Sequence, residues 1–325
     1  MGDFSGIYLV DVRLLDYAAN ELQQGSINMF SLDGYKAIEL SPRIVPRIMR
    51  VDGSIEEGDV DPCGRPWVMW EGRFPPDNSL FTIYASTGMP FDARRDWAVG
   101  EEGPAAPDDN PLGLEQERMT SHNGSHVQGG KGHISHWKGV PDDMKGLWEL
   151  DLETFLGEAA VCNLSNLEPQ AVTTESNYPK EYPKAKFWLP KAEPGEIRGQ
   201  EILPEHLSNV QKGDIVLMAS SFDGLEQPWL STRTVEWLIE DRKIKMLGLG
   251  YPGIEWQYDL KVAAPDNSPV KRMLLGANIP IVHPLVNIET IASDRVFYYG
   301  MPLHVAKLEA SFVRAVAFEE QGESL

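Results

Sequence analysis

The part of the sequence that most restricts the fold lies between residues 212 and 249. It opens with the turn pair Lys-Gly and the continuous apolar run DIVLMAS, which is typical of a strand buried on both faces. Residues Ser231–Arg242 follow with an apolar stripe at helical spacing, and Lys245–Leu249 is again strand-like. A buried strand, an amphipathic helix and a second strand together predict a sheet with a helix packed on it.

The rest of the chain mixes strand and helix patterns without strict alternation. We therefore expect a mixed α/β fold, a single compact domain with a mixed central sheet. Apolar and β-branched segments predict strands within Gly34–Arg50 and at Trp67–Trp70, Leu80–Ser86, Ala159–Leu164, Ile279–Val282, Phe297–Pro302 and Ser311–Phe318. Helical spacing predicts helices at Leu203–Asn209 and Pro269–Gly276, and a short helix or turn at Leu150–Leu156.

We expect one domain at residues 35–318, with an N-terminal entry segment at residues 1–34 and a C-terminal tail at residues 319–325. Two stretches are predicted to be surface excursions: 92–117, which is acidic, proline-rich and low in apolar residues, and 165–198, which is proline-rich and locally basic.

Charge and cysteine content restrict the partners and the location. The net charge of −20 argues against nucleic acid and anionic membranes, since both bind basic surfaces. No apolar run approaches the roughly 20 residues of a membrane-spanning helix, and the N-terminus lacks the basic start of a secretory signal. Two cysteines form no disulfide framework. We expect a cytoplasmic protein that acts on a small molecule.

The stretch MTSHNGSHVQGGKGHISHW, residues 119–137, carries the candidate chemistry. It holds four of the seven histidines, His122, His126, His133 and His136, interleaved with glycines that let the backbone bend. Imidazole is a common metal ligand and titrates near neutral pH. In an extended segment, His122, His126 and Gln128 would share one side and converge on one ion. Solvated turn histidines are the alternative interpretation.

SHNGSHV resembles the signature His-x-Gly-Thr-His-x-Asp-x-Pro-x-His of the metal-dependent cyclase/hydrolase family, which includes bacterial kynurenine formamidases and isatin hydrolase. The order of the segments AIELSP, GDIVLMAS, VKRMLLGANIPIVHPLVNIETI and MPLHVAKLEASFVRAVAF is similar to that family as well. The resemblance covers residues 35–318. It implies a compact β/α domain that forms a homodimer or homotetramer.

The resemblance also implies a metal-ligand set: His122, His126, Gln128 and His283. His122 and His126 match the metal-binding histidines of the motif, whereas Gln128 and His283 stand where the family has carboxylates. Lys271 stands where the family has a histidine. Without the carboxylates a two-metal centre is poorly supported, so we predict at most one divalent ion, zinc or manganese, bound by His122 and His126. Gln128, His133, His136 or His283 would complete its coordination. Lys271 then supplies a positive charge in place of a second ion. Complete loss of the metal is the alternative.

The last histidine of the family motif has no counterpart at the same spacing, because Gly132 occupies its position. His133 follows one residue later, and His136-Trp137 resembles the family's His-Phe pair. We predict that His133, His136 and Lys271 are catalytic and transfer protons. Cys162 fits a buried strand residue better than a nucleophile.

These features predict a metal-dependent hydrolase that cleaves a C–N or C–O bond of an amide, lactone or cyclic imide with metal-activated water. Aromatic side chains predicted to line the pocket for a cyclic or aryl substrate are Trp67, Trp70, Phe81, Tyr84 and Trp137. An ordinary core role for these aromatics is the alternative. Two other hypotheses stay open: a cyclase, dehydratase or isomerase, metal-free and biosynthetic, and a non-catalytic binding protein on the same scaffold.

Overall fold

The structure is a computed structural model, and most of the C-terminal two thirds of the chain is described. The described residues are 34–45, 47–49, 54–59, 68–70, 122, 124–135, 139–171, 194–251, 269–306 and 308–321. The predicted entry segment, the predicted strand Leu80–Ser86 and the predicted excursion 92–117 lie outside these residues, apart from Gly34.

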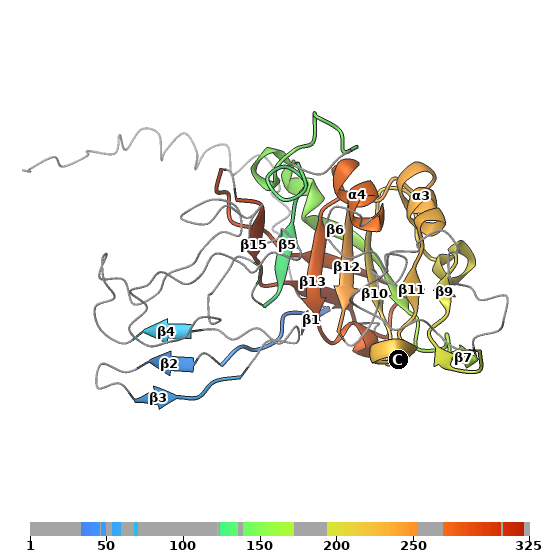
Figure 1. The fold of residues 1–325 in the computed structure, drawn as a ribbon, viewed down its shortest axis with the longest axis horizontal. Helices are drawn as coiled ribbons and strands as arrows, with labels where there is room; N and C mark the ends of the chain where they lie inside the picture. Colours follow the sequence, from blue (N-terminus) through green and yellow to red (C-terminus); the bar gives the residue numbers. More distant parts are fainter. Residues whose placement is uncertain are drawn as a thin grey trace, which may run out of the picture.

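A nine-stranded mixed sheet forms the centre of the molecule (Figure 1). In spatial order it consists of β1 (Tyr35–Glu39), β16 (Val316–Glu320), β14 (Arg295–Tyr299), β6 (Leu156–Asn163), β10 (Ile215–Ala219), β12 (Met246–Gly250), β13 (Ile281–Leu285), β5 (His126–Gln128) and β15 (Ala310–Phe312). The four central strands β6, β10, β12 and β13 are parallel, and the flanking pairs are antiparallel. The predicted mixed α/β fold is confirmed.

The sheet is curled, because its two ends are joined by three residues. β15 is at one end of the strand order and β16 is near the other, yet only Val313–Ala315 separate them in sequence. Within this crossing, the Val313 N–H donates to the carbonyl of Ser125, and the Ala315 carbonyl accepts from the N–H of Leu40. The sequence pattern Ser311–Phe318 is therefore two strands in different parts of the sheet rather than one.

In the part of the chain that the structure describes, two helices cover one face of the sheet. They are α3 (Thr232–Glu240) and α4 (Pro269–Gly276), and α4 has the bounds that the sequence predicts. Their apolar side chains, such as Leu238 and Leu274, pack with Val216 of β10, whereas Leu217 points into a second core on the other face. Because both faces of β10 are covered, all five of its side chains are buried, which explains the continuous apolar run.

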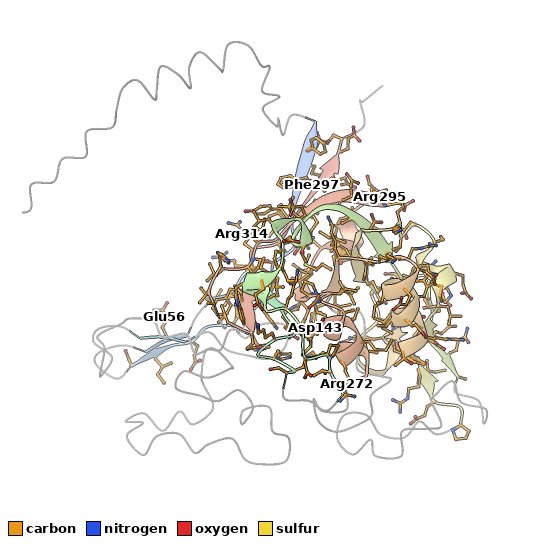
Figure 2. All side chains as sticks on the ribbon, turned by 90° about the horizontal axis from the view of Figure 1, so that it is seen from above. Glu56, Asp143, Arg272, Arg295, Phe297 and Arg314 are labelled. Carbon is orange, nitrogen blue, oxygen red and sulfur yellow. The ribbon has the colours of Figure 1, made fainter. Side chains whose placement is uncertain are left out.

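Shorter elements surround the main sheet. β2 (Arg47–Met49), β3 (Ile55–Glu56) and β4 (Val68–Trp70) form a separate three-stranded sheet, and Figure 2 shows Glu56 apart from the main body that carries Arg295 and Phe297. β7 (Gln170–Ala171) pairs with β8 (Ile197–Arg198), and β9 (Glu201–Ile202) with β11 (Trp229–Leu230). Single 3₁₀ turns are η1 (Leu147–Glu149), η2 (Leu152–Thr154), η3 (Pro204–Leu207), η4 (Gly224–Glu226) and η7 (Ile288–Thr290).

Two sequence predictions differ from this picture in extent. The helix predicted at Leu203–Asn209 is the single turn η3, because the chain already meets the core at Leu207 and Val210, which are both buried. The predicted excursion 165–198 is anchored at its ends, where β7 pairs with β8 and the Arg198 side chain is buried. Residues 172–193 of that stretch lie outside the described part.

The N-terminus of α3 gives a test of local stability. Ser231 is the N-cap residue, and its hydroxyl oxygen accepts a hydrogen bond from the backbone N–H of Thr234 at 3.4 Å. We expect Ser231→Ala to lower the free energy of unfolding by about 1 kcal/mol, because the N–H loses its partner. Urea unfolding followed by circular dichroism measures this change, and Ser231→Thr, which keeps a hydroxyl, should lose less. An Ala variant as stable as the wild type would show that the cap contributes nothing.

Candidate metal site

Two neighbouring strands near one end of the main sheet bring three of the predicted ligands together. His126 of β5 is paired with His283 of the neighbouring β13, and Gln128 is two residues further along the same strand. The period of two in a strand places the His126 and Gln128 side chains on one face, which is the extended arrangement that the sequence allowed. Gly124, with φ of +62°, turns the preceding chain so that His122 returns to the same place.

The loop after β5 adds a further histidine. The N–H groups of His133 and Ile134 both donate to the carbonyl of Gly130, and the buried Ile134 side chain anchors this turn in the core. Gly130 lies so close to α4 that a Cβ atom there would be 2.7 Å from the Leu275 carbonyl oxygen. The glycine therefore lets the loop approach the helix and places His133 beside its N-terminal residues.

Four imidazole rings meet in the interior of the protein. The ring centroids of His122 and His126 are 4.8 Å apart, those of His122 and His133 are 5.3 Å apart, and those of His126 and His283 are 4.5 Å apart. His122, His126 and His133 are buried and His283 is half-buried. His122, His126 and His133 are therefore not solvated turn residues, and this alternative is wrong for these three, whereas His136 lies outside the described residues.

The side chain of Gln128 lies at the centre of the cluster. Its amide Nε2 is 3.2 Å from His122 Nδ1, 3.0 Å from His126 Nε2 and 2.9 Å from His283 Nε2. Its Oε1 has no hydrogen-bond partner among the residues that the structure describes. A half-turn about the last bond exchanges the two atoms, so the amide can present either a donor or an oxygen ligand to the three imidazoles.

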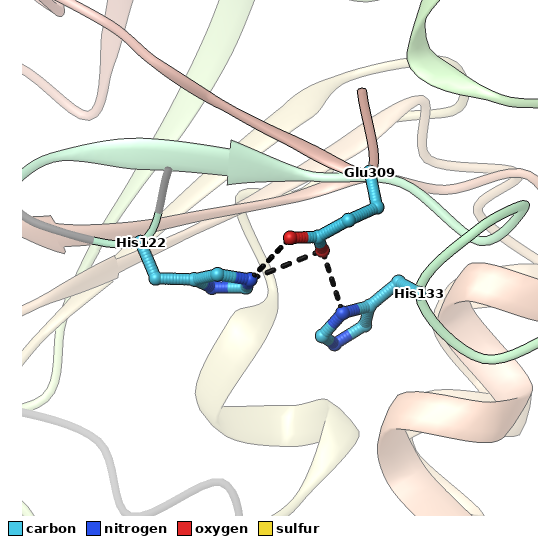
Figure 3. A group of neighbouring side chains, drawn as sticks. All are labelled: His122, His133 and Glu309. Atoms are coloured by element: carbon cyan, nitrogen blue, oxygen red, sulfur yellow. Dashed lines mark hydrogen bonds and ion pairs between the residues drawn. The ribbon is translucent and has the colours of Figure 1, made fainter. Parts of the chain in front are cut away.

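Glu309 completes the cluster, and the sequence analysis missed it. This carboxylate is fully buried in the connection before β15. His122 Nε2 is 2.8 Å and 3.0 Å from its two oxygens, and His133 Nδ1 is 2.8 Å from Oε2 (Figure 3). One ligand atom from each of His122, His133 and Glu309 lies within 4.8 Å of the others, so this trio is a second possible way to hold a metal.

Lys271 of α4 meets His133 from the other side. Its ammonium Nζ is 3.1 Å from His133 Nε2, and the lysine side chain is buried. Burial and the nearby positive charge of Lys271 lower the pKa of His133 to about 3, so the ring is neutral near pH 7. A neutral His133 donates its Nδ1–H to Glu309 and accepts at Nε2 from Lys271.

Glu309 is ionised in this environment. Burial by itself would raise its pKa, but the electrostatic attraction and the hydrogen bonds of the neighbouring His122 and His133 rings outweigh burial and hold the pKa below its ordinary value. Because His133 is neutral, its contribution is the hydrogen bond rather than a full charge. The cluster thus contains one buried anion, one buried cation and four imidazoles.

The remaining predicted site residues fall outside this description. His136, Trp137, Trp67, Phe81 and Tyr84 lie outside the described residues. Trp70 is the last residue of β4, and the orientation of its side chain is outside the description. The predicted roles of these residues stay predictions.

Cys162 behaves as a buried strand residue. Its thiol donates to Asn209 Oδ1 at 3.4 Å, and burial, with the negative charge of Asp214, raises its pKa to about 12. We expect a Cys63→Ser variant to react with a thiol reagent at pH 8 on the order of 1,000-fold more slowly than a free thiol, because little thiolate is present. Absorbance of the released chromophore measures this rate. Labelling as fast as that of a small thiol would contradict the burial.

The fold and the cluster can now be compared with known proteins. A family model described as "Cyclase: Putative cyclase" matches residues 69–255, which is more than half of the chain. No curated protein matches the sequence. No helix in the described part of the chain has the length and apolar character needed to cross a membrane.

Several solved structures are similar to this chain at low identity. Isatin hydrolase A from Labrenzia aggregata, bound to benzyl benzoate, is 16% identical, with 93% of this chain and 99% of that chain covered and a TM-score of 0.45. Isatin hydrolase A from Ralstonia solanacearum is 15% identical over 98% and 100% of the two chains, with a TM-score of 0.45. A potential metal-dependent hydrolase with cyclase activity is 18% identical over 62% and 79%, with a TM-score of 0.40. By the family match, this protein belongs to the cyclase family.

Proposed function

We propose that the protein is a metal-dependent hydrolase of small cyclic or aryl substrates, with a single divalent ion among His122, His126, Gln128 and His283. The observation that carries this proposal is the 3.2 Å contact between His122 Nδ1 and His126 Nε2. Family membership supports the hydrolytic class, and the geometry supports the ion.

The hydrogen bonds around the two rings fix which nitrogens carry protons. His126 Nδ1 is 2.8 Å from the carbonyl oxygen of Gly124, which only accepts, so Nδ1 is the protonated nitrogen. His122 Nε2 faces the Glu309 carboxylate and is protonated for the same reason. The two nitrogens that face each other, His122 Nδ1 and His126 Nε2, therefore both present lone pairs in the neutral rings.

Facing lone pairs repel each other unless a cation or a proton lies between them. Two ligands bound to zinc tetrahedrally at about 2.0–2.1 Å are about 3.3 Å apart, which is close to the observed separation. The Gln128 amide offers two N–H groups to three imidazole nitrogens, so its hydrogens cannot satisfy all three. With the amide turned to present its oxygen, four Lewis bases converge, and the donor set fits a divalent ion.

In the proposed reaction the ion would activate the carbonyl and the water, and side chains of the protein would transfer the protons. A bound divalent ion of this kind polarises a carbonyl and lowers the pKa of its water. His133 and Lys271 are adjacent to the ligands and form a proton-transfer pair, with an ammonium that can donate and a neutral Nε2 that can accept. Lys271 would give a proton to the leaving nitrogen or oxygen of the substrate.

The His133–Lys271 pair also supports a second candidate function. These groups, with Glu309, make a hydrogen-bonded row that needs no ion. A metal-free cyclase, dehydratase or isomerase could use the same pair as acid and base. The two candidates differ in whether activity requires a metal.

Metal analysis with a substrate panel separates these candidates. The panel contains an N-formyl aryl amine, an aryl lactone and a cyclic imide, and hydrolysis is followed by absorbance. We expect about one zinc or manganese per chain, loss of turnover after chelation, and recovery on adding either ion. Turnover that survives complete removal of metal would overturn the hydrolase proposal in favour of the second candidate.

A further inference from the structure

Glu309 contacts two histidines at once from a fixed backbone position. Its carbonyl oxygen accepts a hydrogen bond from the N–H of Gly129 at 2.9 Å, which ties this residue to the chain directly after β5. Its side chain is completely buried and spans from His122 to His133. The sequence separation of 187 residues from His122 shows that the contact depends on the whole fold.

The carboxylate determines which nitrogen of His122 faces the other ligands. A carboxylate that accepts from Nε2–H leaves Nδ1 as the bare nitrogen. That Nδ1 atom is the one within 3.2 Å of both His126 Nε2 and the Gln128 amide. The Gly124 carbonyl accepts from His126 Nδ1, so His126 directs its other nitrogen, Nε2, at the remaining ligands. His122 directs Nδ1 at the same point.

Glu309 also supplies the negative charge that this ligand set lacks. His122, His126, His283 and Gln128 are all neutral ligands, so a bound divalent ion would keep its full charge. A carboxylate that is one hydrogen bond behind an imidazole raises the basicity of the ring and offsets part of the charge on the ion. Glu309 is the buried carboxylate within hydrogen-bonding distance of His122.

The second carboxylate contact orients the proton-transfer histidine. Glu309 Oε2 accepts from His133 Nδ1, which directs His133 Nε2 toward the Lys271 ammonium. One carboxylate therefore orients both His122, which would bind the ion, and His133, which would take part in proton transfer with the substrate. A change at Glu309 should disturb both functions together.

We propose that Glu309 is a positioning residue that makes His122 bind the divalent ion through Nδ1 and holds His133 against Lys271. This inference rests on the proposed metal function. It differs from direct ligation by Glu309, in which His122 Nε2 and His133 Nδ1 would contact the ion.

Zinc affinity measures the first part of the proposal. We expect Glu309→Gln to weaken zinc binding by about 10–100-fold in competition with a chromophoric chelator, the range found when the partner behind a metal-binding histidine is lost. Glu158→Gln is the matched control, because the Glu158 side chain is 67% exposed and far along the sheet, and it should bind zinc like the wild type. Equal affinity of Glu309→Gln and wild type would overturn the inference. A wild-type protein that binds neither zinc nor manganese would instead overturn the proposed function.

The ring nitrogens of the wild-type protein give a test that does not depend on a stable variant. Two-bond ¹H–¹⁵N correlation spectra of the metal-free protein should show His122 protonated at Nε2 and His133 protonated at Nδ1. On adding zinc, the ¹⁵N shift of His122 should change at Nδ1. Protonation of His122 at Nδ1, or a zinc-induced change at Nε2, would overturn the inference, and the second result would make Glu309 a ligand. In folded Glu309→Gln, a loss of the single His133 form supports the positioning role.

Discussion

His126→Ala is expected to lower the affinity for zinc or manganese by more than about 100-fold and to abolish metal-dependent turnover. The reason is that His126 Nε2 is 3.2 Å from His122 Nδ1 and 3.0 Å from the Gln128 amide, at the point where the ligands converge. Loss of an outer hydrogen-bond partner alone costs roughly 10–100-fold in metal affinity, so loss of a ligand should cost more. Isothermal titration calorimetry on the metal-free protein measures the affinity.

The matched control for this prediction is His304→Ala. His304 is exposed, and its ring Nε2 is 3.2 Å from the carbonyl oxygen of Trp148, which is not a residue of the cluster. This variant should bind metal and turn over substrate as the wild type does. If both histidine variants lose metal equally, or if His126→Ala keeps the wild-type affinity, His126 is not a ligand.

Leu217→Ala is expected to lower the free energy of unfolding by about 2–5 kcal/mol, the largest stability effect that we predict. Leu217 is completely buried at the middle of β10, where β6 and β12 flank it on both sides. The packing around it is tight, since a Cβ atom at Gly248 would approach its Cδ2 to 2.7 Å. The truncated side chain therefore leaves a cavity that the rigid central strands close poorly.

Urea unfolding followed by circular dichroism tests this prediction, with Leu152→Ala as the control. The Leu152 side chain is 67% exposed in η2, so the same substitution there should change stability by less than about 0.5 kcal/mol. A Leu217→Ala variant that unfolds at the same urea concentration as Leu152→Ala would show that β10 is not at the centre of the core.

The strands and helices that the sequence predicts well are those whose apolar pattern follows directly from which faces of the element are buried. DIVLMAS is continuous in apolar residues because helices cover one face of β10 and a second apolar layer covers the other. Helix α4 was bounded correctly, with proline at its first position and glycine at its last. The break between β15 and β16 could not be predicted, because it follows from the curl of the whole sheet rather than from any residue in Val313–Ala315.

In the site, too, contacts between residues close in sequence could be predicted, whereas a contact between residues far apart in sequence could not. The spacing of His126 and Gln128 on one strand is local, and the resemblance to the family placed His283 near them, as the strand pairing does. Glu309 had no such signal, since it is one of 49 acidic residues and meets His122 across 187 positions. The sequence around it, KLEASF, does not distinguish this carboxylate from the others, and only the fold shows which histidines it contacts.

Anomalous X-ray scattering from a crystal of the manganese- or zinc-loaded protein tests the central claim most directly. We predict one peak per chain, bounded by His122 Nδ1, His126 Nε2, His283 Nε2 and the Gln128 amide, with Glu309 outside the coordination sphere. A peak between His122 Nε2, His133 Nδ1 and Glu309, or a loaded crystal without a peak at the histidine cluster, would contradict this account.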